Sequence, residues 1–192
     1  PRRGWGPEAA GTARTAKAVA FAPLAASDER PIRPERLVAE VQRVLDADAV
    51  VVADPGTPCP YFSAYYELRS AGRHFISNRA HGALGYAMSA AVGAHYGRPG
   101  AKVVAVMGDG SFGFTCGELE TIVRQRVPMT MIVVSNASYG WIKAGQRAGF
   151  DARYYSVDFS RTDHAAVAAA FGVKSWRVED PACLGPVLAK AV

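Results

Sequence analysis

Short apolar runs alternate with segments of helical periodicity along most of the chain. The runs Val103–Met107 and Met129–Val134 are rich in β-branched residues and bounded by glycine, proline or polar residues, which is typical of buried strands. Residues 35–45 place their apolar side chains on one helical stripe. The repeated alternation predicts an α/β fold, a doubly wound and mostly parallel sheet with helices on both faces.

The same pattern predicts the other elements. Strands are expected over 49–53, 74–76, 102–107, 129–134 and 173–178. Helices are expected over 35–45, 61–68, 82–96, 115–126, 163–171 and 181–189, with a helical turn over 139–147 and an N-cap at Thr162 or Asp163.

Residues 1–33 differ from the rest because they show no clean hydrophobic period. We interpret them as a linker or tail from a preceding domain, with a transit peptide as the alternative. Residues 34–192 then form one domain. The chain stops inside or just after the last predicted helix.

Composition and charge limit which partners and which cellular location we expect for this protein. The chain has 192 residues, of which 49% are hydrophobic and 20% charged, with a net charge of +5. The sequence holds no apolar run of transmembrane length and no basic stripe with interleaved aromatic residues, so neither a membrane nor nucleic acid is an expected partner. The three cysteines lack metal-type spacing. We expect reduced, mostly buried thiols and a cytoplasmic protein.

The chemistry centres on Gly108-Asp109-Gly110, which is followed by 25 residues and then by Asn136. Each end of this stretch comes directly after a predicted strand, so two parallel strands would bring a carboxylate and an amide to the carboxyl edge of the sheet, where ligands bind. Both are hard oxygen ligands that suit Mg²⁺. At Gly110 and Ser111 a helix is expected to open, with backbone N–H groups available to a diphosphate.

This pattern resembles the thiamine-diphosphate-dependent enzymes, in their pyrophosphate-binding domain, over roughly residues 35 to 190. That family normally continues into one more strand, so the resemblance implies a domain truncated at its C-terminus, as a fragment or as one piece of a split enzyme. The family signature is Gly-Asp-Gly, a spacer of this length and Asn-Asn, whereas the pair here is Ser135-Asn136. The resemblance implies Asp109, Asn136 and the main-chain carbonyl of Ser138 as Mg²⁺ ligands. It implies Gly108 and Gly110 as part of the loop that holds thiamine diphosphate.

Two further segments resemble cofactor loops of the family. The stretch Asp54–Cys59 is similar to the Asp-x-Gly loop of acetolactate-synthase-like members, which implies cofactor contacts from Gly56 and Thr57. A plain strand-to-helix loop is the alternative. The resemblance also implies that Tyr139 and Gly140 cover the diphosphate.

The stretch Ala80–Tyr86 resembles the turn that seats the aminopyrimidine ring. The resemblance implies that the carbonyl of Gly82 and the N–H of Leu84 bind that ring. The Leu84 side chain would wedge between the two rings and enforce a bent cofactor, which is catalysis by proximity. His81 is a candidate acid or base, with a structural or solvent-facing role as the alternative.

The resemblance implies an enzyme that decarboxylates a small 2-oxo acid or transfers the resulting acyl group, similar to acetolactate synthase. The family's activating Glu comes from a separate pyrimidine-binding domain, which is therefore an expected partner, and we also expect a homo-oligomer. One alternative is a non-catalytic cofactor-binding subunit of a split enzyme. The other is a nicotinamide Rossmann dehydrogenase, because Gly108, Gly110 and Gly113 match its glycine spacing.

Overall fold

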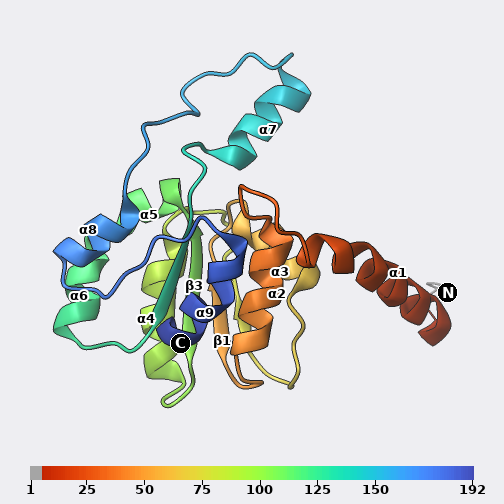
Figure 1. Cartoon of the computed structure of the whole chain (residues 1–192), viewed down its shortest axis with the longest axis horizontal. Coiled ribbons are helices and arrows are strands. Elements are labelled where there is room, and N and C mark those ends of the chain that lie inside the picture. Colours follow the sequence, from red (N-terminus) through yellow and green to blue (C-terminus); the bar gives the residue numbers. More distant parts are fainter. Residues whose placement is uncertain (1–5) are drawn as a thin grey trace.

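The computed structural model describes residues 6–192 and has a parallel sheet at its centre (Figure 1). Within these residues the sheet has four strands in the order β2-β1-β3-β4. The strands are β1 Val50–Ala53, β2 Phe75–Ile76, β3 Val103–Gly108 and β4 Thr130–Val134. All pairs are parallel. The expected doubly wound α/β fold is thus confirmed.

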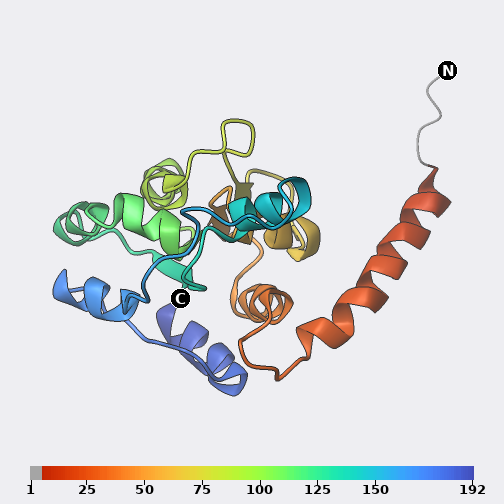
Figure 2. The ribbon, with the colours of Figure 1, turned by 90° about the horizontal axis from the view of Figure 1, so that it is seen from above.

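Helices cover both faces of this sheet, as Figure 2 shows for α2 and α9 on one side and α4 on the other. Along β1, Val51 and Ala53 belong to one core cluster while Val50 and Val52 belong to the other, because successive strand side chains point to opposite faces. The first core is covered by α2 Pro34–Val44, α3 Pro58–Tyr65 and α9 Pro181–Ala191. The second is covered by α4 Tyr86–Gly97, α5 Asp109–Thr115, α6 Glu118–Arg124 and α8 His164–Ala170.

The topological switch point of the sheet, where the chain changes the direction in which it adds strands, lies at β1. The chain goes from β1 to β2 on one side and reaches β3 on the other side only after α4. In open α/β sheets such a point opens a crevice beyond the carboxyl ends of the strands. Asp54 follows β1, and Asp109 follows β3. The register that pairs Gly108 with Val134 brings the end of β4 level with the end of β3.

The expected strand over 173–178 is wrong, because the segment has no regular secondary structure and pairs with no strand in the described part of the chain. Its hydrogen bonds run to α8 instead. Val173 N donates to Ala168 O, and the Ser175 hydroxyl donates to Ala165 O at 2.8 Å. Strand-like composition does not by itself supply a pairing partner, and none of residues 173–178 is buried.

Three expected helices begin or end elsewhere. The helix expected over 61–68 lies three residues earlier, as α3. The helix expected from residue 82 begins at Tyr86, because Gly82 and Gly85 take positive φ values of 76° and 88° that no α-helix contains. The helix expected over 115–126 is the shorter α6, and α5 precedes it, with Cys116-Gly117 between the two helices. Helical structure therefore starts directly at Asp109, and the carboxylate lies in its first turn.

The expected irregular tail is partly helical. Residues 1–5 lie outside the described residues, but α1 spans Pro7–Ala25 and projects from the body of the molecule (Figures 1 and 2). The ring of Phe21 stacks on that of Tyr65 with centroids 4.5 Å apart, which fixes the end of α1 to α3. The expected turn over 139–147 is a full helix, α7 Gly140–Gly149, on the segment that projects above the sheet in Figure 1.

Candidate functional site at the carboxyl edge of the sheet

The carboxylate of Asp109 joins the ends of β3 and β4. Its Oδ2 accepts hydrogen bonds from the Asn136 N–H at 2.8 Å, the Ala137 N–H at 2.6 Å and the Ser135 hydroxyl at 3.1 Å. Its Oδ1 accepts from the Gly110 N–H at 2.9 Å. The residue is only 4% exposed. The expected meeting of this carboxylate with the 135–136 segment is therefore present, and Ser135 is an integral part of it.

The three oxygens expected to bind Mg²⁺ belong to one short loop system. Asn136 Oδ1 accepts from the Ser138 N–H at 3.1 Å, and the Ser138 carbonyl accepts from the Gly140 N–H at 2.9 Å. Asp109 Oδ1, Asn136 Oδ1 and the Ser138 carbonyl each accept one hydrogen bond and so retain a second lone pair for a metal. A carboxylate, a side-chain amide and a main-chain carbonyl form the hard-oxygen set that Mg²⁺ takes together with substrate phosphates. The donor set thus fits Mg²⁺ in its chemistry, and the ligand assignment stays a prediction.

The loop after β1 lies against this loop system. A Cβ atom added to Gly140 would lie 3.0 Å from Asn136 Nδ2 and 3.2 Å from Thr57 Oγ1. Thr57 is half-buried and begins the approach to α3. Thr57, Asn136 and Gly140 therefore surround one small space, although they are far apart in the sequence.

Tyr139 packs its ring directly on the backbone of Gly110. A Cβ atom on Gly110 would collide with this ring, so the close approach requires glycine. The two residues border an open cavity of about 400 Å³, which Phe114, Asp158 and Phe159 also line. The cavity lies beside the Asp109 loop, where a bound diphosphate would need room.

The turn before α4 contains the expected ring-binding residues. Asn78 closes it, because its carbonyl accepts from the His81 and Gly82 N–H groups at 3.0 and 2.9 Å. The Asn78 Nδ2 donates to Ala83 O at 3.3 Å, whereas its buried Oδ1 has no partner within residues 6–192. His81 is exposed on this turn. Sequence analysis missed Asn78, since an isolated Asn before a glycine-rich stretch carries no specific signal.

Leu84 faces the β1 loop. Its Cδ2 lies 3.6 Å from the position that a Cβ atom on Gly56 would occupy. The residue is half-buried. The expected ring wedge and the expected diphosphate loop are therefore direct neighbours.

Asp54 is the site residue whose role sequence analysis did not find. Its carboxylate is fully buried and accepts hydrogen bonds from Gly85 N, Ala87 N and the Ser111 hydroxyl. Burial raises the pKa of this carboxyl above its ordinary value, and the three hydrogen bonds act in the opposite direction. The Ser111 side chain is committed to Asp54, so only its backbone N–H remains for the diphosphate contact expected of it.

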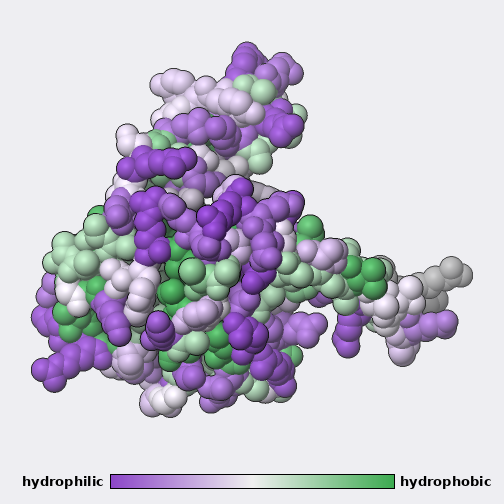
Figure 3. All heavy atoms as spheres, viewed as in Figure 1, coloured by the Kyte–Doolittle hydropathy of each residue, from purple (hydrophilic) through white to green (hydrophobic). Residues whose placement is uncertain are grey.

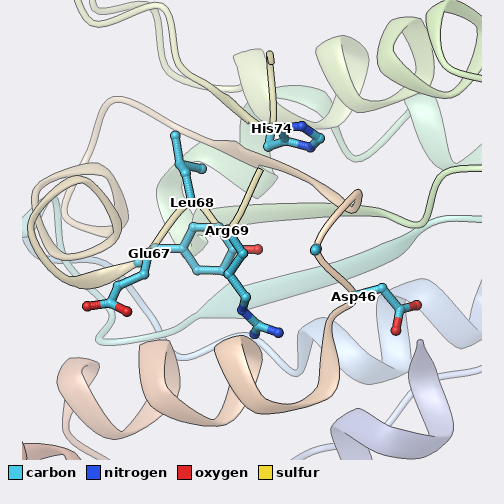
Figure 4. A pocket seen from close by; sticks show the side chains of 7 residues that line it. Asp46, Glu67, Leu68, Arg69 and His74 are labelled. Carbon is cyan, nitrogen blue, oxygen red and sulfur yellow. The ribbon is translucent and has the colours of Figure 1, made fainter. Parts of the chain in front are cut away.

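A second hollow lies at the amino end of the sheet, away from these residues (Figure 4). Asp46 and Arg69 line it, and the buried ring of His74 contributes Nε2, which is 3.0 Å from the Ser70 hydroxyl. The nearby contacts with backbone carbonyls make His74 a packing residue there. The chemistry-bearing residues gather at the opposite edge.

Comparison with known proteins assigns the chain to a family. Residues 54–192 match the family described as thiamine pyrophosphate enzyme, C-terminal TPP binding domain. The chain is 36% identical to acetolactate synthase of Bacillus subtilis over 155 residues, covering 81% of this chain and 27% of that protein. It is 30% identical to benzoylformate decarboxylase of Pseudomonas aeruginosa, covering 80% of this chain and 29% of that protein.

A third relative has another reaction in its name. The chain is 31% identical to a probable sulfoacetaldehyde acetyltransferase of Rhizobium meliloti, covering 83% of this chain and 27% of that protein. The chain thus spans less than a third of the length of these relatives. Family membership decides between the nicotinamide and thiamine interpretations in favour of thiamine. The chain belongs to the C-terminal TPP-binding domains of thiamine pyrophosphate enzymes, whose cofactor is thiamine diphosphate with Mg²⁺ as the usual metal.

Proposed function

We propose that this chain holds thiamine diphosphate for an enzyme that decarboxylates a small 2-oxo acid or transfers the resulting acyl group, as the names of its relatives describe for those proteins. The observation that supports this most is the Asp109 carboxylate, which binds the backbone of Asn136 across two adjacent strand ends. When bound, thiamine diphosphate supplies a nucleophilic carbon that accepts and releases acyl groups.

In this proposal the chain's residues bind and orient the cofactor. Asp109, Asn136 and the Ser138 carbonyl hold Mg²⁺ against the diphosphate. Four glycines keep backbone close to the cofactor, and Thr57, Tyr139 and the Ser111 N–H complete the diphosphate site. The glycines are Gly56, Gly108, Gly110 and Gly140.

On the ring side, the Gly82 carbonyl and the Leu84 N–H bind the aminopyrimidine, and the Leu84 side chain supports the bent cofactor. The half-buried position of Leu84 beside Gly56 supports this role. His81 is exposed in this chain. An acid or base that acts on an incoming substrate has to be accessible in this way before a partner domain covers the site.

The metal assignment is tested with Asp109→Asn. The structure makes Asn the better replacement than Ala, because Ala would leave the Asn136 and Ala137 N–H groups without an acceptor. We expect the Mg²⁺-dependent affinity for thiamine diphosphate to fall at least tenfold in calorimetry, while the far-ultraviolet spectrum stays unchanged. Asp48→Asn, on an exposed residue before β1, is the matched control. An unchanged affinity in Asp109→Asn would refute the metal site.

We further propose that a pyrimidine-binding domain, in the same parent chain or in another subunit, completes the active site. The small share of each relative that this chain covers supports the proposal. The domain itself would begin near Pro34, because α2 and β1 belong to the same core as α9. In residues 6–192 no helix is long and apolar enough to cross a membrane. The three free cysteines suit a cytoplasmic location.

A non-catalytic cofactor-binding subunit is the second candidate. A turnover assay with a 2-oxo acid separates the two proposals. Activity that appears only on addition of a pyrimidine-binding domain supports the enzyme. Cofactor binding without turnover in that mixture supports the subunit.

A further inference from the structure

The buried carboxylate of Asp54 connects three segments that meet beside the proposed site. Its Oδ2 accepts from Gly85 N and Ala87 N, each at 3.1 Å, and its Oδ1 accepts from the Ser111 hydroxyl at 3.0 Å. Gly85 ends the 78–85 turn, Ala87 lies in the first turn of α4, and Ser111 lies in α5. One side chain therefore joins the end of β1 to the turn and to the helix that follows Asp109.

The 78–85 turn depends on such a connection. Gly82 and Gly85 both have positive φ, and glycine backbone is intrinsically permissive, so the turn has little stiffness of its own. The Asn78 contacts close the turn internally without attaching it to the sheet. Thr115 Oγ1 donates to Gly85 O at 3.4 Å. This hydrogen bond is longer than the three that Asp54 accepts from Gly85, Ala87 and Ser111.

Attachment at Gly85 fixes the residue before it. Leu84 is adjacent to Gly85, and its Cδ2 faces Gly56 in the loop that Asp54 begins. On the other side, Ser111 lies two residues after Asp109. The Asp54 carboxylate thereby sets how far the ring-side turn lies from the proposed metal loop.

We propose that Asp54 is a positioning residue that holds the 78–85 turn, and with it Leu84, in place against α5. It acts as a hydrogen-bond acceptor, because its partners are two N–H groups and a hydroxyl. The side chain is fully buried, so it works through Gly85 and Ser111 without touching the cofactor. The part that concerns thiamine diphosphate rests on the proposed function.

The acceptor role predicts a specific order of variants. Asn keeps an oxygen for Gly85 N and Ala87 N, and its NH₂ group can donate to the Ser111 hydroxyl, which rotates to accept. Leu has a similar size but no acceptor, and it leaves both N–H groups buried and unpaired. Asp54→Asn should therefore preserve the turn, and Asp54→Leu should release it.

The first test measures hydrogen–deuterium exchange of the ligand-free chain. We expect the Gly85 and Ala87 amides to exchange about tenfold faster in Asp54→Leu and within about twofold of wild type in Asp54→Asn. Amides of β3 report global stability in the same samples. Asp54→Ala replaces the Leu variant if the latter fails to fold. Equal exchange in the Asn and Leu variants, or unchanged exchange at both amides, would overturn the proposal.

The second test compares two probes in the presence of Mg²⁺, inorganic pyrophosphate and thiamine diphosphate. We expect Asp54→Leu to weaken thiamine diphosphate binding about tenfold and pyrophosphate binding less than about twofold, with Asp54→Asn close to wild type. An equal loss for both probes would mean a general effect on folding and would overturn the positioning role. If wild type bound neither probe, the proposed function would fail, and the exchange experiment would still decide the role of Asp54.

Discussion

Among single residues, the contact of Tyr139 with Gly110 offers the sharpest test of the site's packing. Gly110 and Gly113 both lie in α5. A Cβ atom added at Gly110 would meet the Tyr139 ring, whereas one added at Gly113 would meet no atom within 4 Å. We expect Gly110→Ala to lower the free energy of unfolding by about 1–3 kcal/mol. Gly113→Ala should be neutral or stabilising by about 0.5–1 kcal/mol, since Gly weakens helices.

Urea unfolding followed by circular dichroism measures both values. The double variant Gly110→Ala/Tyr139→Ala adds a check, because removal of the ring leaves room for the new methyl group. A destabilisation by Gly110→Ala that persists at the same size in the double variant would show that the collision with Tyr139 is not its cause.

Asp54 also predicts a pH dependence of stability. Burial raises the pKa of its carboxyl in the folded chain, so folding favours the protonated form. Its contribution is therefore fully present below the unfolded pKa of about 3.9 and is lost as the pH rises through the folded pKa. We expect the stability of wild type relative to Asp54→Asn to decrease as the pH rises above about 4. A difference that stayed constant, or that grew with pH, would contradict this direction.

Sequence could locate most of the site's residues, but it could not assign their contacts. The spacing from Asp109 to Asn136 identified two strand ends, and parallel pairing brought them together. Asp54 was placed only in a loop, because nothing local indicates that its side chain turns inward to Gly85. That contact depends on the position of α4, which long-range packing determines.

At the scale of elements, local composition predicted strands and helices better than it predicted their ends or pairing. Buried runs such as β3 carry an unambiguous signal. Residues 173–178 contain valine and tryptophan residues that are typical of strands, yet they contact α8 without joining the sheet. The α1 helix was missed because it has no buried residue and so needs no hydrophobic stripe.

The attachment of α1 gives a prediction at this scale. Phe21 stacks on Tyr65, and the Lys17 ammonium donates to Ala64 O at 2.8 Å, so the second half of α1 is fixed to α3. We expect Phe21→Ala to accelerate tryptic cleavage after Lys17 severalfold without changing the unfolding midpoint of the sheet, because local opening suffices for cleavage. Val19→Ala, at a side chain that is 69% exposed, is the control. Equal cleavage rates in all three proteins would show that the stacking does not hold α1.

At the scale of the whole molecule, the exposed apolar side chains indicate which surface another domain or copy would cover. On the face that carries α2 and α9, hydrophobic and hydrophilic residues are interspersed (Figure 3). The segment with α7 exposes several large apolar or aromatic side chains, among them Trp141, Ile142 and Phe150. Three helices on the other side of the sheet each leave one large apolar side chain exposed. These are Tyr96 of α4, Phe114 of α5 and Val123 of α6.

Phe114 is the most informative of the three, because it is 64% exposed and also lines the cavity beside Gly110. Large exposed apolar groups at a functional cavity mark surfaces that another domain or copy covers. We therefore expect the chain to self-associate, with a larger mass at higher concentration in light scattering, and to show no 2-oxo acid turnover alone. Phe114→Ser should shift the mass towards the monomer, whereas Val19→Ser on α1 should not. A monodisperse wild-type monomer with robust thiamine-dependent decarboxylation would contradict both expectations, since the cavity would then need no covering surface to work.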